Sequence, residues 1–152
     1  MRVVIQRVSH ASVGIVAEDG TNAIQEKRSI GQGLLVLLGV CEEDQAEDVE
    51  WLVKKIANLR VFDDENGVMN RSVIDIGGEA LVVSQFTLYA DCRRGNRLSF
   101  TDAARPDLAI PLYERFCDNA VRDGFSVDRG VFGADMQVSL VNDGPFTVMV
   151  EV

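Results

Sequence analysis

The strongest constraint on the fold of this chain is the way its hydrophobic periodicity changes along the sequence. Most of the chain consists of short runs with the alternation that is typical of β-strands. Two segments, 44–60 and 105–125, instead place apolar residues at the spacing of an amphipathic helix. No internal repeat, low-complexity tract or linker interrupts the chain. We therefore predict a single α+β domain over residues 1–152, with two main helices and a mostly antiparallel sheet that curls toward a barrel.

Three runs carry most of the strand prediction. The first spans residues 3–13, and alternation separates its early side chains into two faces: Val3, Ile5 and Arg7 on one, and Val4, Gln6 and Val8 on the other. An arginine on an otherwise apolar face either lies at a rim or pairs with a specific partner. The apolar run 33–40 is expected to be covered on both faces, and the run 79–88 to carry polar residues where it ends. The charged segment 16–33 is predicted as a long hairpin or surface loop around Asp19-Gly20.

Local signals place the ends of the two helices. Asp44, followed three residues later by Glu47, resembles a capping box at the start of the first helix. The second helix is expected to bury Leu112, Phe116, Ala120 and Val121. Prolines 106 and 111 are expected in or before its first turn, and Gly124 is expected to end it. Between the helices, residues 60–62 and 68–70 are predicted as short strands on either side of a turn.

Charge and composition narrow the classes of function. The formal net charge of −9 argues against a general nucleic-acid binder and excludes neither a small basic patch nor an enzyme that grips one end of an RNA. One candidate patch is "CRRGNR", with Arg93, Arg94 and Arg97 followed by Arg105; the alternative is a solvated loop. The longest apolar stretch is too short to span a membrane, and the start of the chain reads as a strand, with no signal peptide. We therefore expect a cytoplasmic protein without a membrane segment.

Few residues are suited to catalysis by the common mechanisms. His10 is the sole histidine, and it lies on the first strand with no motif around it, so a structural role is the favoured interpretation. The cysteines are odd in number and lack C-x-x-C spacing, which indicates neither a disulfide framework nor a zinc site. No phosphate-binding glycine motif is present. We expect no metal and no cofactor.

The segment "SQFTL" at 84–88 is the clearest cluster of polar groups in a core strand. Alternation predicts Ser84, Phe86 and Leu88 on one face of the strand and Gln85 and Thr87 on the other. The segment is either a strand that emerges into solvent or a set of donors aimed at a carbonyl or hydroxyl group. Residue chemistry alone does not choose between these interpretations.

A second unusual segment lies near the C-terminus. Asn142-Asp143-Gly144 between two β-rich runs predicts a tight hairpin, because these residues tolerate positive φ. Pro145 follows at once, although proline has no N–H to donate to a β-ladder. Either Pro145 is the first residue of the last strand, or a Gly-Pro peptide, in the cis or trans form, is held out from the sheet as a functional element.

These segments together resemble the D-aminoacyl-tRNA deacylase family. The resemblance rests on "SQFTLYAD" at 84–91, "MQVSLVNDGPFT" at 136–147 and "QRV" at 6–8, and it extends over nearly the whole chain. It implies a homodimer that hydrolyses the ester between a D-amino acid and the 3′-terminal adenosine of tRNA, also accepts glycyl-tRNA, and needs no cofactor. It implies a site at the dimer interface, where the "SQFTL" segment of one subunit faces the Gly-Pro dipeptide of the other.

The resemblance also assigns roles to individual residues. The catalytic pocket would be lined by Ser84, Gln85, Phe86 and Thr87. A cis Gly144-Pro145 peptide, braced by Arg7, would act as a chirality filter. The acceptor end of the tRNA would be bound by Arg93, Arg94 and Arg97. No DNA partner is expected. Two departures from the family pattern are Leu98, where proline is usual, and a longer loop at 14–29.

Several alternatives stay open from the residues alone. Hydrolysis is expected to rely on positioning, on preorganised N–H donors for the oxyanion and on the vicinal 2′-hydroxyl of the RNA. The rival mechanism makes Thr87 a nucleophile, although no neighbour in the sequence would activate it. Two alternatives to a tRNA-ester hydrolase are a non-catalytic RNA- or metabolite-binding dimer of the same fold and a hydrolase of small molecules.

Overall fold

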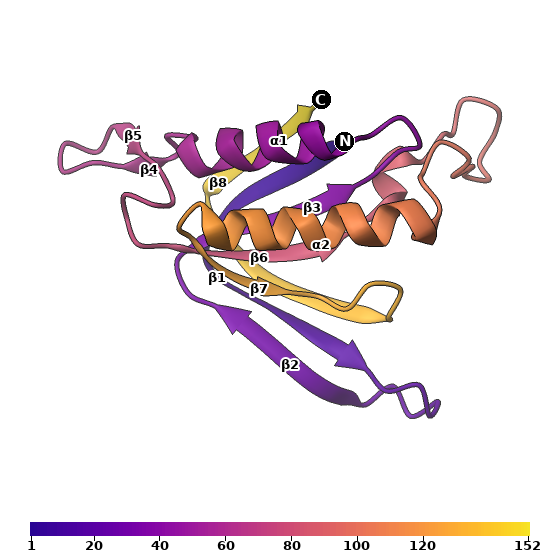
Figure 1. Cartoon of the computed structure of the whole chain (residues 1–152). Coiled ribbons are helices and arrows are strands. Elements are labelled where there is room, and N and C mark those ends of the chain that lie inside the picture. The colour runs from indigo at the N-terminus through magenta and orange to yellow at the C-terminus, as the bar shows by residue number, and fades with distance from the viewer.

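The computed structural model describes residues 1–152 as one mixed sheet with two helices packed on it (Figure 1). A short 3-10 helix, η1, follows β6, and a small hairpin is formed by β4 and β5. The elements in chain order are β1 (Arg2–Val16), β2 (Ile24–Ile30), β3 (Gly33–Gly39), α1 (Ala46–Asn58), β4 (Phe62–Asp63), β5 (Met69–Arg71), β6 (Glu79–Ser84), η1 (Phe86–Tyr89), α2 (Pro106–Arg122), β7 (Ser126–Arg129) and β8 (Met136–Glu151).

Strand β1 organises the sheet. It pairs antiparallel with β2, β3 and β8, whereas β3–β6 and β6–β7 are parallel pairs. The resulting order is β2-β1-β3-β6-β7, and β8 pairs with β1 outside this order. Arg28 of β2 donates a hydrogen bond to the carbonyl of Arg129 in β7, so the two ends of this order approach each other. The predicted curled, mostly antiparallel α+β fold is confirmed, and its two parallel pairs are an addition to that prediction.

The core has two parts, one on each face of the sheet. The larger cluster lies between the sheet and the two helices, and the smaller one lies inside the curl. Val3 and Ile5 of β1 belong to the larger cluster, whereas Ala11 and Val13 belong to the smaller one. The pairing of β1 with β8 shifts register between Val8 and His10, and this shift reverses which face the odd-numbered residues cover.

The predicted central strand agrees with the structure. All of β3 except Leu37 is buried, because helices cover one face and the curl of the sheet covers the other. Gly33 begins this strand where it meets β6 at very close range. A Cβ atom at Gly33 would lie 1.9 Å from the carbonyl oxygen of Glu79, so only glycine permits this approach.

The helix boundaries differ from prediction at two positions. The capping box of α1 is formed by Gln45 and Asp48, whose carboxylate accepts the Gln45 backbone N–H at 2.8 Å, and not by Asp44 and Glu47. Asp44 does not act as a cap because its carboxylate accepts from the α-ammonium group of Met1 and from the Cys41 N–H.

In α2, Pro106 is in the first turn as predicted, but Pro111 lies inside the helix. A proline there lacks the N–H that would reach the carbonyl one turn back. Val121 is 58% exposed and is not part of the buried stripe, so that assignment was also wrong. Gly124 has a φ of +104°, which confirms it as the residue that ends the helix.

The predicted C-terminal hairpin is absent. Both halves of β8 pair antiparallel with β1, so the chain continues in one direction through residues 142–147. Gln6 lies opposite Thr147 and Val8 lies opposite Asn142, which leaves residues 143–146 facing Arg7 alone. These four positions form an outward bulge, which we call the Gly-Pro loop, and the Gly144-Pro145 peptide within it is cis. Pro145 is therefore not the first residue of a separate strand.

Two hairpins were predicted correctly. The charged segment after β1 turns at residues 17–23 and returns as β2, and β4 and β5 flank the turn at 64–68. Neither helix is long and apolar enough to pass through a lipid bilayer.

Candidate functional site

The polar segment after β6 does not continue as a strand. Strand β6 ends at Ser84, the Gln85 N–H makes a last bond to the Leu38 carbonyl at 2.8 Å, and the chain then turns into η1. The predicted alternation of Gln85 and Thr87 against Phe86 is therefore wrong, because a 3-10 turn rotates successive side chains by about a third of a circle. The turn allows the Gln85 side-chain amide to donate a hydrogen bond to the Thr87 hydroxyl.

The start of η1 also presents two backbone donors. The N–H groups of Phe86 and Thr87 have no partner within η1, because they belong to the first residues of this 3-10 helix. Ser84 is partly buried, whereas Phe86 is 54% exposed and points its ring away from the core. The segment thus combines backbone N–H donors, two hydroxyl groups and an exposed aromatic ring within four consecutive residues.

A pocket of about 610 Å³ lies beside Phe86. The Phe86 ring meets the Phe100 ring edge to face, with 5.1 Å between centroids, and Phe132 lines another part of the wall. The carboxylate in the lining, Glu42, accepts the Arg105 backbone N–H at 3.0 Å. Sequence reasoning missed Phe100 and Phe132, because each is a single aromatic residue in an irregular segment and follows no periodic pattern.

Arg7 holds the base of the Gly-Pro loop. Its guanidinium donates to the Asp143 carbonyl at 3.1 Å and to the Val61 carbonyl at 2.7 Å, and it lies 5.6 Å from the centroid of the Phe146 ring. Its side chain is only 11% exposed. The predicted contact between Arg7 and this loop exists, but Arg7 donates to the carbonyl of Asp143 and not to those of Gly144 and Pro145.

Asn142 closes the neck of the same loop. Its side-chain amide donates to the Arg7 carbonyl at 3.0 Å and to the Phe146 carbonyl at 2.7 Å. These two bonds replace ladder pairing where the loop leaves the sheet. Sequence reasoning assigned Asn142 only a role in a turn, because the long-range bond to Arg7 has no local signal. Gly144 and Pro145 are left exposed at the tip.

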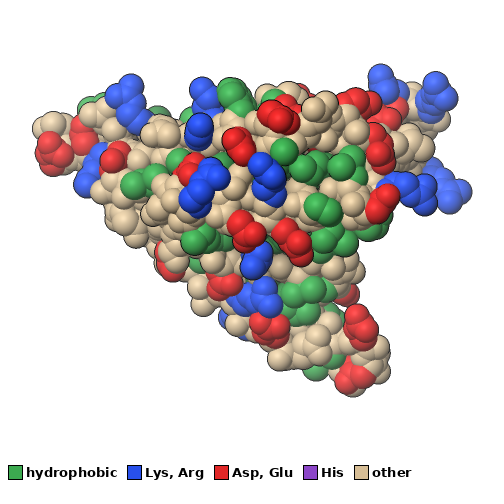
Figure 2. All heavy atoms as spheres, viewed as in Figure 1, with side chains coloured by type: hydrophobic (Ala, Val, Ile, Leu, Met, Phe, Trp, Pro, Cys, Tyr) green, Lys and Arg blue, Asp and Glu red, His purple; other side chains and the backbone are tan.

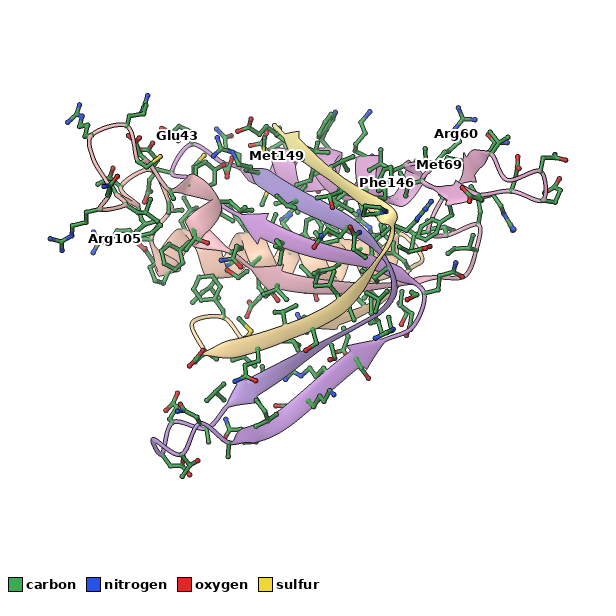
Figure 3. All side chains as sticks on the ribbon, turned by 180° about the vertical axis from the view of Figure 1, so that it is seen from behind. Glu43, Arg60, Met69, Arg105, Phe146 and Met149 are labelled. Atoms are coloured by element: carbon green, nitrogen blue, oxygen red, sulfur yellow. The ribbon has the colours of Figure 1, made fainter.

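The two motifs lie at opposite ends of the first half of β1. Arg2 donates to the Leu88 carbonyl of η1 at 2.6 Å, whereas Arg7 contacts the Gly-Pro loop. Five residues of strand separate these contacts by about 17 Å, at roughly 3.3 Å per residue. In Figure 3, Phe146 of the Gly-Pro loop and Arg60 lie toward one end of the molecule, and Arg105, which lines the pocket beside Phe86, lies toward the other. Within a single subunit, Gly144 and Pro145 therefore do not reach the Ser84–Thr87 segment.

The predicted basic loop follows η1 and is closed by the pairing of Asp91 with Ser99. Arg93 is bound by Asp91 at 2.8 Å, and its guanidinium lowers the pKa of that carboxyl to about 2. Arg94 and Arg97 are exposed and make no ion pair. Figure 2 shows Lys and Arg side chains gathered at the end of the molecule where Figure 1 draws this loop. Of the three arginines, Arg94 and Arg97 are thus free to meet an anion.

The remaining reactive groups are not arranged for catalysis. His10 is exposed on β1, and its side chain makes no hydrogen bond or ion pair. Cys117 is buried, and burial raises the pKa of its thiol to about 11; burial also raises the pKa of the Cys41 thiol. No three His, Cys, Asp or Glu side chains are grouped so that they could hold a metal ion.

Comparisons with known proteins agree on one family. A family model described as D-Tyr-tRNA(Tyr) deacylase matches residues 4–151. The D-aminoacyl-tRNA deacylase of Parabacteroides distasonis is 57% identical over 99% of this chain and 97% of that protein. Those of Bacteroides thetaiotaomicron and Chlorobaculum tepidum are 54% and 55% identical over the same shares.

Two solved structures share the fold. One, titled c-Myc DNA Unwinding Element Binding Protein, has a TM-score of 0.87 and 39% identity, and covers 100% of this chain and 99% of that one. The other, titled a probable eukaryotic D-amino acid tRNA deacylase, has a TM-score of 0.80 and 18% identity over 99% and 98%, and it supports the fold alone.

Proposed function

Because the chain belongs to the D-Tyr-tRNA(Tyr) deacylase family, we propose that it hydrolyses the ester that joins a D-amino acid to the 3′-terminal adenosine of tRNA. The observation that carries this proposal is the near full-length identity of more than half of the residues with relatives named for that activity. The Ser84–Thr87 and Gly144-Pro145 motifs supply a site for it. The reaction is the hydrolysis of a carboxylic ester, with the free D-amino acid and tRNA as products.

The active unit we propose is a homodimer. Gly144 and Pro145 are exposed, and about 17 Å of strand β1, at roughly 3.3 Å per residue, separates their loop from η1 of the same chain. Strand β8 pairs only with β1, and Val138, Val141 and Met149 are exposed along it. A strand with one unpaired edge and exposed apolar residues favours association with a second chain. In the dimer, the Gly-Pro loop of one subunit faces the Ser84–Thr87 segment of its partner.

The substrate's chemistry matches the groups around η1. The N–H groups of Phe86 and Thr87 are positioned to stabilise the oxyanion that forms when water attacks the ester carbonyl. The pocket beside Phe86 offers Phe100 and Phe132 for stacking with the terminal base. An aminoacyl ester is already activated, so positioning and oxyanion stabilisation suffice, and the proposal includes no metal or cofactor.

We propose that stereospecificity arises by exclusion. The D and L forms of an aminoacyl ester carry the same groups, so contacts to the side chain alone do not separate them. The backbone of Gly144 and Pro145, placed against the substrate's Cα, would clash with an L side chain and leave room for a D side chain. Glycine has no side chain and would be accepted.

The first experiment measures hydrolysis of D-Tyr-tRNA, L-Tyr-tRNA and Gly-tRNA by the purified protein. We expect turnover of D-Tyr-tRNA and Gly-tRNA and no turnover of L-Tyr-tRNA. A non-catalytic binding protein would release no amino acid from any of them. A hydrolase of small molecules would cleave D-tyrosine methyl ester at least as well as D-Tyr-tRNA. Cleavage of L-Tyr-tRNA at the same rate as D-Tyr-tRNA would contradict the exclusion mechanism.

The arginine loop gives a second prediction. Replacing Arg94 and Arg97 together by alanine should raise the KM for D-Tyr-tRNA and leave kcat unchanged, because these unpaired cations meet phosphates outside the reacting centre. The slope of log KM against log salt should fall by about 1.4, or about 0.7 for each single-strand phosphate that is no longer neutralised. Arg93→Ala is the matched control and should have less effect, because Asp91 already binds Arg93. An unchanged KM in the double variant would make this loop a solvated surface.

One structural relative is named for DNA binding, which is a property of that protein. The net charge of −9 disfavours a general grip on duplex DNA here, whereas a single-stranded acceptor end needs only a local basic patch. We therefore propose aminoacyl-tRNA as the nucleic-acid partner. The cytoplasm, where aminoacyl-tRNA is made and used, is the proposed location.

A further inference from the structure

The cations that make no ion pair are unevenly distributed over this acidic chain. Most arginines outside the basic loop are ion-paired, among them Arg2, Arg7, Arg28, Arg115, Arg122 and Arg129. Apart from Lys27 on β2, the unpaired cations gather in two places. One is the arginine loop and the start of α2, with Arg94, Arg97 and Arg105; the other is the C-terminal end of α1 and the β5 strand, with Lys54, Lys55, Arg60 and Arg71.

The second group surrounds an exposed tryptophan. Trp51 is 46% exposed, and the Lys55 ammonium lies 5.2 Å from the centroid of its ring. A shallow hollow of about 470 Å³ is formed by what we call the α1 patch: Trp51, Lys54, Lys55, Asn58, Leu59 and Arg60. Its helical members recur at intervals of three and four residues, so they lie on one face of α1. The opposite face, with Leu52, Val53 and Ile56, is buried in the core.

The α1 patch is continuous with the Gly-Pro loop. Arg60 precedes Val61, whose carbonyl accepts a hydrogen bond from Arg7 at 2.7 Å. The same guanidinium donates to the carbonyl of Asp143 at the base of the loop. Figure 3 shows Arg60, Met69 and Phe146 at this end of the molecule, far from Arg105. One arginine thus links the loop that is proposed to enter the partner's site to the segment that carries the patch.

We propose that the α1 patch binds the phosphate backbone of the double-helical acceptor stem of the tRNA whose ester occupies the partner's site. This inference rests on the proposed deacylase function and its dimer. In the proposed dimer, the Gly-Pro loop of one subunit lies at the aminoacyl end of the substrate. The α1 patch of that subunit extends from the base of the loop over the subunit's outer surface. The stem, which follows the single-stranded end held by the partner's arginine loop, would meet this surface.

The chemistry of the α1 patch favours an RNA backbone over a protein surface. Lysine ammonium groups are point charges that neutralise phosphates without reading the base sequence, as an enzyme that acts on many tRNAs requires. A protein interface is depleted in lysine at its centre, whereas two of the six residues that form this patch, Lys54 and Lys55, are lysines. In a chain with a net charge of −9, cations without acidic partners provide a local attraction for an otherwise repelled polyanion.

The test compares two substrates on one variant. The variant carries Lys54→Gln, Lys55→Gln and Arg60→Gln, and the substrates are full-length D-Tyr-tRNA and the D-tyrosyl ester of the short single-stranded 3′ end alone. With full-length tRNA we expect KM to rise on the order of tenfold. Its log-log salt slope should fall by about 2 or more, because each duplex phosphate that is no longer neutralised removes about 0.9 from that slope. With the short ester we expect no change in kcat or KM, because it has no stem.

Lys27→Gln is the matched control, since Lys27 is also exposed and unpaired but lies on β2; it should behave as wild type on both substrates. Two results would overturn the inference: an unchanged KM for full-length tRNA, or an equal rise in KM for both substrates, which would place the effect in the ester site. Binding of wild type to anionic phosphatidylserine vesicles that is abolished in the triple variant, with normal KM for tRNA, would also overturn it. If wild type cleaves neither substrate, the proposed function fails instead. Circular dichroism and the unfolding temperature show whether the variant is folded.

Discussion

Replacing Gly144 with alanine is expected to lower kcat/KM for D-Tyr-tRNA by about 100-fold, the usual effect of a displacement of about 1 Å in a positioned group. Gly144 has a φ of +123°, which residues with a Cβ rarely adopt. A Cβ at this position would also lie 2.8 Å from Nη2 of Arg7. Both effects move the Gly-Pro loop or its brace, and the proposed site needs that loop in one place. The D-to-L ratio of kcat/KM should fall as well, because the displaced backbone no longer excludes the L side chain.

A control variant separates backbone strain from the loss of the loop's position. Gly20 has a φ of +79° in the hairpin between β1 and β2, and a Cβ there would meet no atom within 4 Å. Gly20→Ala should therefore lose a similar amount of stability from backbone strain and keep its activity. Unfolding temperature and steady-state kinetics on both variants make the comparison. If Gly144→Ala retains wild-type kcat/KM and D-to-L ratio, the Gly-Pro loop has no role in the site.

Periodic features of the fold could be predicted from the sequence. The long apolar run of β3, the alternation in β1 and the buried stripes of both helices follow from burial, which acts along a whole element. The parallel pairing of β3 with β6 was not predicted, because pairing depends on how α1 and the β4–β5 hairpin return the chain to the sheet. Local pattern does not specify that path.

The C-terminal segment shows where local rules fail. Asn142-Asp143-Gly144 has the composition of a tight turn, and a turn with reversal is the commonest outcome of that composition. Here Asn142 bonds to the carbonyl of Arg7, a residue 135 positions away in the chain. Pairing with β1 on both sides of the loop then keeps the strand direction. The same turn-forming residues therefore make an outward loop, because the partner strand was beyond the reach of a local prediction.

The candidate site was predicted in part. The Ser84–Thr87 and Gly144-Pro145 segments were singled out from the sequence, and the predicted contact of Arg7 with the Gly-Pro loop exists through the Asp143 carbonyl. Phe100 and Phe132 were missed, since isolated aromatic residues in irregular segments become neighbours of Phe86 only through the fold. The change from strand to 3-10 helix after Ser84 was also missed. This change frees the Phe86 and Thr87 N–H groups, which a continuing strand would have paired with its neighbour.

A substrate whose terminal adenosine lacks the 2′-hydroxyl is expected to be hydrolysed about 100-fold or more slowly, the range typical for loss of a group that transfers protons. The pocket holds no histidine, and the Glu42 carboxylate in its lining is bonded to the Arg105 N–H. His10 lies on β1 beside Val141, outside the pocket lining. We therefore expect the 2′-hydroxyl next to the ester, which the substrate itself supplies, to transfer the proton. Single-turnover rates on matched ribose and 2′-deoxyribose esters make the comparison.

Thr87→Ala tests the rival mechanism and should keep most of the activity, within about tenfold of wild type. The Thr87 hydroxyl oxygen accepts a hydrogen bond from the Gln85 amide, and no basic group is placed to remove its proton. An amide donor makes a hydroxyl oxygen less nucleophilic, whereas catalytic Ser and Thr residues donate their proton to a base. A loss of several thousandfold in Thr87→Ala, recovery in Thr87→Ser and normal hydrolysis of the 2′-deoxy ester would together establish Thr87 as the nucleophile. Full activity of Thr87→Ala with a slow 2′-deoxy ester would assign the proton transfer to the RNA.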